Sequence, residues 1–116
     1  MSTIVHMAAQ ADWERAQVEG SYQAESLQTE GFIHFSTPKQ VARVANAIYA
    51  GRTDLVLLVV DEARLDAELK YEPPTGTYTP GEELFPHLYG PLNLGAVERV
   101  VPYLPDTDGV FAPPVL

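Results

Sequence analysis

The sequence predicts one small α+β domain, in which a strongly bent mixed or antiparallel sheet packs against two main helices. Three observations lead to this fold class. The chain has 116 residues, which suits one hydrophobic core and leaves no room for a second. Helical and extended patterns alternate in the first half of the chain, and extended patterns dominate the second half. No internal repeat interrupts this order, which is typical of an α+β architecture.

The first half of the chain begins with a strand, a helix and a second strand. Residues 3–8 are apolar on both faces apart from one histidine, as in a buried strand. Residues 11–19 carry apolar side chains at helical spacing and end before Gly20, the residue type that most often follows a helix. Residues 31–36 alternate as a strand, and His34 and Ser36 fall on the same face.

A capping box predicts the start of the second main helix. Thr37 would be the N-cap, Pro38 the first helical residue, and Gln40 the third. Apolar residues then recur at helical spacing as far as Tyr49, and Gly51 follows the helix.

The second half of the chain reads mainly as strands. Residues 55–60 are continuously apolar, which indicates a central strand covered on both faces. Residues 68–72 and 96–103 are further strands, and residues 85–93 return to apolar structure. Proline and glycine between residues 73 and 81 predict a long loop of the kind that often carries function.

The predicted domain covers residues 1–104. The remaining residues, 105–116, are rich in proline, glycine and aspartate. We expect them to form a loose C-terminal tail with few contacts.

Charge and composition exclude several classes of function. Seven Lys and Arg residues stand against sixteen Asp and Glu residues, which gives a formal net charge of −9. Such a surface repels nucleic acids and anionic membranes, so neither is an expected partner. The chain has no cysteine, which excludes thiolate chemistry and disulfides. It shows no signal peptide, and its longest apolar run is too short to span a bilayer, so we expect a soluble cytoplasmic protein.

The three histidines are the main candidate functional residues. His6, His34 and His87 each lie inside an apolar stretch, and no histidine lies in a polar segment. Imidazole can act as acid, base, ligand or hydrogen-bond donor near neutral pH. The alternative is that each ring is a buried structural residue bonded to a carbonyl.

Two other ligand types follow from the same residues. The start of the predicted second helix, together with Ser36, Lys39 and Arg43, offers donors for an anion, although Ser36 or Thr37 could instead cap that helix. Three histidines also match a known zinc pattern. Their wide spacing in the sequence is not diagnostic, and no metal ligand is assigned.

Two strings of residues stand out, Glu30-Gly31-Phe32-Ile33-His34-x-Ser36 and Pro86-His87-x-Tyr89-Gly90-Pro91-Leu92. Together they resemble a known family, the domain of unknown function 952 family. The likeness covers roughly residues 4–103, with further matches at Trp13, Gly20, Tyr22 and Tyr71-Glu72. Phe35 departs from the family, which often has cysteine there.

That family looks like a small, divergent relative of the ADP-ribosyltransferase fold. The resemblance implies that His6 matches the first-strand histidine that grips the nicotinamide ribose, and that His34 stands where that fold has a tyrosine. Met7-Ala8 replaces the expected Gly-Ser. The catalytic glutamate of that fold has no counterpart before Leu88-Tyr89, so no carboxylate inherits its role.

The resemblance and the histidines together predict a cleft that binds NAD or a related nucleotide or phosphoribosyl ligand. His34 and His87 are the catalytic candidates, and the ligand-binding candidates are His6, Ser36, Lys39 and Tyr89. If the protein is an enzyme, it is an ADP-ribosyl-type transferase or an NAD glycohydrolase, with NAD as its substrate. A ligand-binding module without turnover and a three-histidine metal protein are the alternatives.

Overall fold

The computed structural model describes residues 3–73 and 83–116, which form strands, three α-helices and two 3₁₀ turns. The helices are α1 (Gln10–Glu19), α2 (Glu25–Thr29) and α3 (Val41–Ile48), and the turns are η1 (Glu62–Arg64) and η2 (Leu94–Ala96). The strands are β1 (Thr3–Ala9), β2 (Ser21–Tyr22), β3 (Ile33–His34), β4 (Leu55–Asp61), β5 (Glu68–Glu72), β6 (Phe85–Tyr89), β7 (Leu92–Asn93) and β8 (Val97–Pro102). The predicted α+β class is therefore confirmed.

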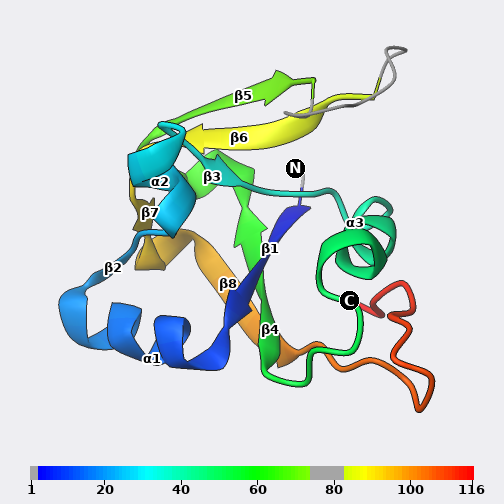
Figure 1. Ribbon diagram of the computed structural model, residues 1–116. Coiled ribbons are helices and arrows are strands. Elements are labelled where there is room, and N and C mark those ends of the chain that lie inside the picture. The colour runs from blue at the N-terminus through cyan, green and yellow to red at the C-terminus, as the bar shows by residue number, and fades with distance from the viewer. Residues whose placement is uncertain (1–2, 74–82) are drawn as a thin grey trace.

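The strands form two three-stranded sheets, in the orders β1-β4-β8 and β3-β6-β5, and a two-stranded ladder of β2 and β7 (Figure 1). Every pairing among the described strands is antiparallel. The expected single bent sheet is thus divided into these three parts. The two three-stranded sheets are joined where Val5 and Ser36 exchange two backbone hydrogen bonds, each of 2.8 Å.

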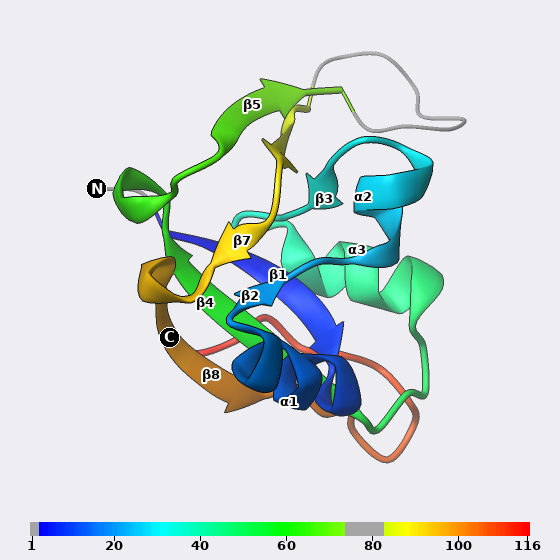
Figure 2. The same cartoon turned by 90° about the vertical axis from the view of Figure 1, so that its left-hand side faces the viewer.

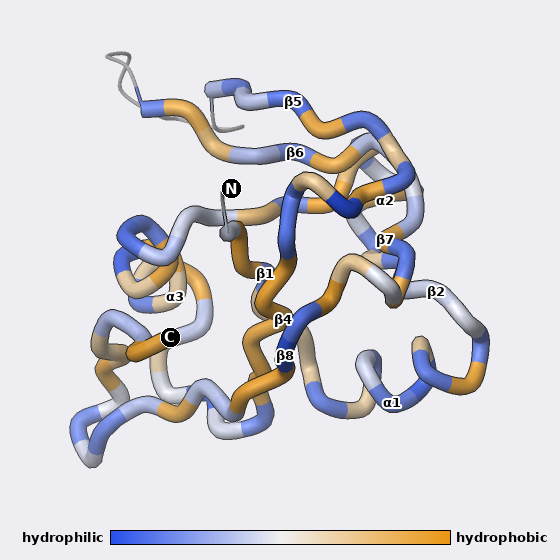
Figure 3. The backbone as a smooth tube through the Cα atoms, turned by 180° about the vertical axis from the view of Figure 1, so that it is seen from behind, coloured by the Kyte–Doolittle hydropathy of each residue, from blue (hydrophilic) through white to orange (hydrophobic). Residues whose placement is uncertain are grey.

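Strand β4 forms the centre of the core, as its continuous apolar run predicts. All of its residues are buried, and it pairs with β1 on one side and β8 on the other. Alternate residues pack on opposite faces: one hydrophobic cluster contains Val56, Leu58 and Val60, and a second contains Leu55, Leu57 and Val59. Burying a large aliphatic side chain contributes about 1.5–3 kcal/mol, so this strand supplies much of the stability. Figure 3 shows the hydrophobic colouring of β4.

Helix α1 ends where the sequence predicts. Gly20 adopts a left-handed conformation with φ 92°, and its N–H donates to the carbonyl of Ala16 over 2.8 Å. Only glycine enters this region without a steric penalty, which explains the helix end. Viewed from the side in Figure 2, α1 lies next to β2, to which Gly20 connects it.

Helix α3 begins at Val41, three residues later than the capping box predicts. Residues 38–40 form a turn instead. Half of the predicted box is present, because the Gln40 side-chain oxygen accepts a hydrogen bond from the Thr37 N–H over 2.9 Å. The amide nitrogen of Gln40 donates to the carbonyl of Leu84, so this side chain also fixes the turn to the segment before β6.

The second expected strand, residues 31–36, is shorter than predicted. Only Ile33–His34 is regular strand, and Ser36 adds the isolated bridge to β1. The predicted loop at residues 73–81 falls almost wholly within residues 74–82, outside the described part of the chain. No helix among the described residues has the length and apolar composition needed to cross a membrane.

The C-terminal residues 105–116 are not a loose tail. Phe111 is 2% exposed and packs against Tyr103, whose hydroxyl donates to the carbonyl of Ala112. Asn46 of α3 donates to the Phe111 carbonyl over 3.0 Å and accepts from the Phe111 N–H over 2.7 Å. One buried aromatic ring and one reciprocal amide pair therefore anchor a segment whose proline, glycine and aspartate residues predicted few contacts.

Candidate functional site

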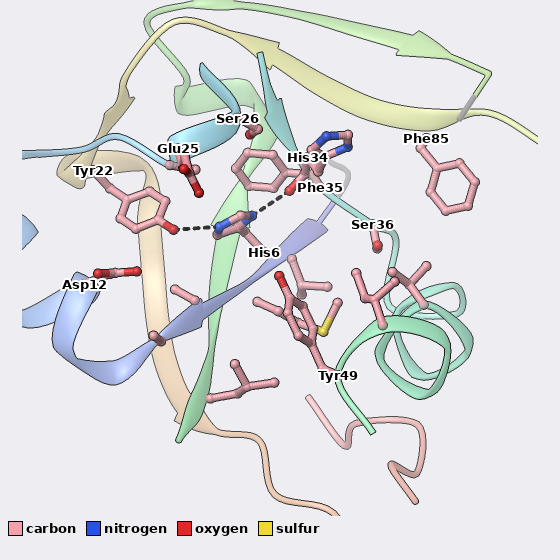
Figure 4. Close-up of a pocket in the computed structure, with 18 of the residues that line it drawn as sticks. His6, Asp12, Tyr22, Glu25, Ser26, His34, Phe35, Ser36, Tyr49 and Phe85 are labelled. Carbon is pink, nitrogen blue, oxygen red and sulfur yellow. Dashed lines mark hydrogen bonds between the residues drawn. The ribbon is translucent and has the colours of Figure 1, made fainter. Parts of the chain in front are cut away.

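A cavity of about 590 Å³ lies beside β1 and is bordered by residues from α1, α2, β3, α3 and β6 (Figure 4). Three strands each bring one histidine to it: His6 from β1, His34 from β3 and His87 from β6. Ser36 also lines it. Four aromatic side chains complete the wall: Tyr22, Phe35, Tyr49 and Phe85.

His6 is held in place by both of its ring nitrogens. Nδ1 lies 2.5 Å from the backbone carbonyl of His34, and Nε2 lies 2.8 Å from the Tyr22 hydroxyl. A carbonyl can only accept, so Nδ1 carries the hydrogen. Burial lowers the pKa of His6 from 6.5 to about 4, so the neutral ring accepts the Tyr22 hydrogen at Nε2. His6 thus links β1, β2 and β3 and has no free nitrogen for a ligand.

His34 lies directly opposite His87 in the β3–β6 pairing, and their rings are 5.5 Å apart. Nε2 of His34 lies 3.1 Å from a carboxylate oxygen of Glu30. The His34 side chain is 43% exposed, which leaves it accessible from solvent. The register of two adjacent strands therefore pairs the two histidines that we predicted to be catalytic.

His87 is the more enclosed member of this pair. Its side chain is 2% exposed, and its ring stacks on Phe32 with centroids 4.1 Å apart. Nδ1 of His87 lies 2.9 Å from Oε1 of Glu72, which also accepts a hydrogen bond from the Tyr89 hydroxyl over 2.5 Å. Hydrogen bonds from Tyr89 and then from His87 hold the pKa of Glu72 below its usual value. Glu72 is therefore an ionised carboxylate that fixes the ring.

The charged groups around the cavity are mostly acidic. Asp12 and Glu25 both line it, and Arg52 is the only lysine or arginine among the described lining residues. Arg52 is engaged by Asp54 through two hydrogen bonds of 2.9 and 2.7 Å, which raise the pKa of Arg52 and lower that of Asp54. A ligand with a positively charged part would meet this cavity more favourably than a polyanion.

Two predicted ligand-binding residues lie away from the cavity. Lys39 is exposed and is not among the lining residues. Tyr89 faces β5, where it bonds to Glu72 and lies under Lys70 at 4.9 Å.

The predicted anion cradle at the start of α3 is also occupied by the protein itself. The carboxylate of Glu83 accepts hydrogen bonds from the Gln40 amide and from the Arg43 guanidinium. A carboxylate from the segment before β6 thus already engages Arg43, one of the donors that we expected to bind an external anion.

The described residues do not assemble a three-histidine metal site. They contain no group of three or more His, Asp or Glu side chains placed to hold a metal ion. His6 in particular has both ring nitrogens engaged, one of them by a backbone carbonyl.

The sequence did not reveal which partners orient the histidines. Tyr22, Phe32 and Glu72 all belong to the family likeness, but nothing in the sequence connected any of them with a particular histidine. The pairing of β5 with β6 decides the contact to Glu72, because it puts residues 68, 70 and 72 on the same face as His87. The alternation of residues 68–72 was the available signal, but strand register does not follow from it.

Comparison with known proteins places the chain in a wider group. The model of a family described as protein of unknown function (DUF952) matches residues 7–100. A crystal structure of protein CC0527 from Caulobacter crescentus is 32% identical, with 96% of this chain and 94% of that chain covered and a TM-score of 0.82. Its solution NMR structure is 33% identical, with 95% and 91% covered and a TM-score of 0.77. No curated protein matches the chain.

Proposed function

The chain belongs to the DUF952 family of proteins of unknown function, and we propose that its cavity binds the nicotinamide–ribose end of NAD or of a related nucleotide. The observation that carries this proposal is the meeting of three histidines from three strands with four aromatic rings in one cavity. Its volume of about 590 Å³ falls in the range of small-molecule sites. Flat aromatic walls suit a planar ring, and polar groups suit ribose hydroxyls.

The charge of the cavity favours one end of such a ligand. Asp12 and Glu25 line it, and the charge of Arg52 is offset by Asp54. The nicotinamide ring of NAD is cationic, whereas the pyrophosphate is anionic. The nicotinamide ribose would therefore lie near His34 and His87, with the pyrophosphate towards solvent.

The chemistry proposed is cleavage of the bond between nicotinamide and ribose, either by transfer to an acceptor or by hydrolysis. Such a reaction develops positive charge on the ribose, and nearby carboxylates stabilise it. The resemblance to the ADP-ribosyltransferase fold supports this reading. His6 is not proposed to hold the ribose, as the resemblance implied, because both of its ring nitrogens form hydrogen bonds within the protein. Tyr22, whose hydroxyl meets His6 at the cavity wall, takes its place as the group next to the ligand.

An NMR titration with NAD tests binding. The three histidines give few ring signals, so each is assignable. We expect the signals of His34 and His87 to shift together and to saturate, and nicotinamide mononucleotide to reproduce the shifts better than ADP-ribose. Lys39→Ala is the matched control, since Lys39 is exposed and outside the cavity. Unmoved histidine signals at millimolar NAD would contradict the proposal.

A ligand-binding module without turnover is the second candidate. The observation in its favour is that Glu72 does not line the cavity and reaches it only through His87. Glu30, the carboxylate bonded to His34, is not among the lining residues either. Released nicotinamide, measured after incubation with NAD, separates the two candidates: an enzyme accumulates it and a binding module does not.

A further inference from the structure

We infer that Glu72 is the positioning residue of His87, and that Nε2 of His87 takes a proton from a water molecule that attacks the ligand. This inference rests on the proposed function and deepens it, because it selects hydrolysis over transfer. It is carried by the arrangement of Glu72, Tyr89, His87 and Phe32 on one face of the β3-β6-β5 sheet.

The hydrogen bond to Glu72 decides which nitrogen of His87 is basic. An ionised carboxylate only accepts, so the hydrogen of the neutral ring is on Nδ1, 2.9 Å from Oε1 of Glu72. When the ring is neutral, its lone pair is on Nε2, to which no hydrogen bond is found within residues 3–73 and 83–116. His87 lines the cavity, so the ring that carries this lone pair borders the proposed ligand site.

The ring is also fixed in orientation. Phe32 stacks on it with an angle of 18° between the planes, and the side chain is 2% exposed. Glu72 is itself held by the Tyr89 hydroxyl, so the orienting carboxylate does not rotate freely. A base whose direction is set by a hydrogen-bonded carboxylate needs little reorganisation when it accepts a proton.

The other two histidines are less suited to this role. His6 has no free lone pair, because its Nε2 already accepts from Tyr22. His34 is bonded to Glu30, and its side chain is 43% exposed, so solvent competes for its free nitrogen. His34 instead lies 5.5 Å from His87, where it can contact the same ligand.

The step balances without any further reactant. The oxygen of water forms a bond to the anomeric carbon of the ribose, and one of its protons passes to Nε2 of His87. The carbon–nitrogen bond breaks, and its electron pair neutralises the nicotinamide ring. The products are ADP-ribose and nicotinamide, and His87 then releases the proton to solvent.

Glu72→Gln in the full chain tests the inference, with Glu68→Gln as the matched control. Glu68 is on the same strand and the same face, is exposed, and lies opposite Tyr89 rather than His87. We expect Glu72→Gln to lower kcat for nicotinamide release by about 10- to 100-fold with little change in KM. The nitrogen shifts of the His87 ring should change from a single Nδ1-protonated form to a mixture of tautomers. The control should leave both readouts unchanged.

Three results would overturn the inference, and they can be told apart. A Glu72→Gln protein with wild-type kcat and an unchanged His87 tautomer removes Glu72 from the mechanism. A wild-type protein whose histidine signals respond to NAD but which releases no nicotinamide removes hydrolysis and leaves binding intact. A wild-type protein whose signals do not respond to NAD removes the proposed function as well.

Discussion

The Tyr22 hydroxyl donates a hydrogen bond to Nε2 of His6 over 2.8 Å, between two side chains that are 4% and 8% exposed. The neutral state of His6 makes this direction of donation necessary, because its Nδ1 hydrogen is used by the His34 carbonyl. Burial raises the pKa of Tyr22, so the hydroxyl stays protonated. The two residues therefore form a neutral polar pair at the wall of the cavity.

Tyr22→Phe should destabilise the protein by about 1–3 kcal/mol, because it leaves the buried Nε2 of His6 without a donor. Tyr71→Phe is the control. Its hydroxyl donates to Glu62 over 3.0 Å, but the residue is 41% exposed, so the loss should be about 0.5 kcal/mol or less. Urea unfolding of both variants measures the difference, and equal losses would contradict a buried role for Tyr22.

The stability of the protein should fall between pH 6.5 and pH 4 because of His6. Its pKa is about 4 when folded and returns to 6.5 when the chain unfolds, so in this window only the unfolded chain binds the proton. Acidification therefore favours unfolding, by on the order of 3 kcal/mol over the whole window. Urea unfolding at several pH values measures the slope. His6→Gln should flatten it, and an equally steep slope in that variant would assign the effect to other groups.

Gly90→Ala should destabilise the protein by about 1–3 kcal/mol through overpacking. A β-carbon at this position would lie 2.7 Å from the β-carbon of Ala67, closer than van der Waals contact allows. Gly95→Ala is the control, since a β-carbon there would have no heavy atom within 4 Å. Thermal unfolding compares the two, and a Gly90→Ala protein as stable as the control would show that the backbone near Ala67 yields freely.

Phe111→Ala should cost about 3–5 kcal/mol, the range for removing a buried aromatic side chain. Phe111 is 2% exposed and belongs to the cluster that packs on β4. Val115→Ala, at a residue that is 97% exposed, should have little effect. Denaturant unfolding of the full chain checks both, and a small loss at position 111 would restore the view of this segment as a loose tail.

The sequence predicted helices and strands correctly where residues close together in the chain determine them. The apolar run of β4 and the glycine after α1 are local features, and both appear in the structure. The capping box failed in part because Gln40 also bonds to the distant Leu84 carbonyl and Glu83. The prediction of a loose tail rested on proline, glycine and aspartate and overlooked Phe111, which is buried. Contacts between distant segments therefore account for both errors.

Four of the six candidate site residues line one cavity, whereas Lys39 and Tyr89 do not, and the geometry did not follow from the sequence. His6, His34, His87 and Ser36 all line one cavity, as the sequence led us to expect. Their partners depend on strand register, which decides that His34 faces His87 and that Glu72 reaches the same ring. A one-residue change of register would reverse every side chain, and composition does not determine it.

The link from His6 to β3 ends on the main chain of residue 34 and not on its side chain. Any amino acid at that position supplies the same carbonyl, so the scaffold and the chemistry of the cavity are encoded separately there. Evolution, or a protein engineer, can therefore exchange the side chain at position 34 to alter what the cavity recognises while the architecture around His6 stays intact.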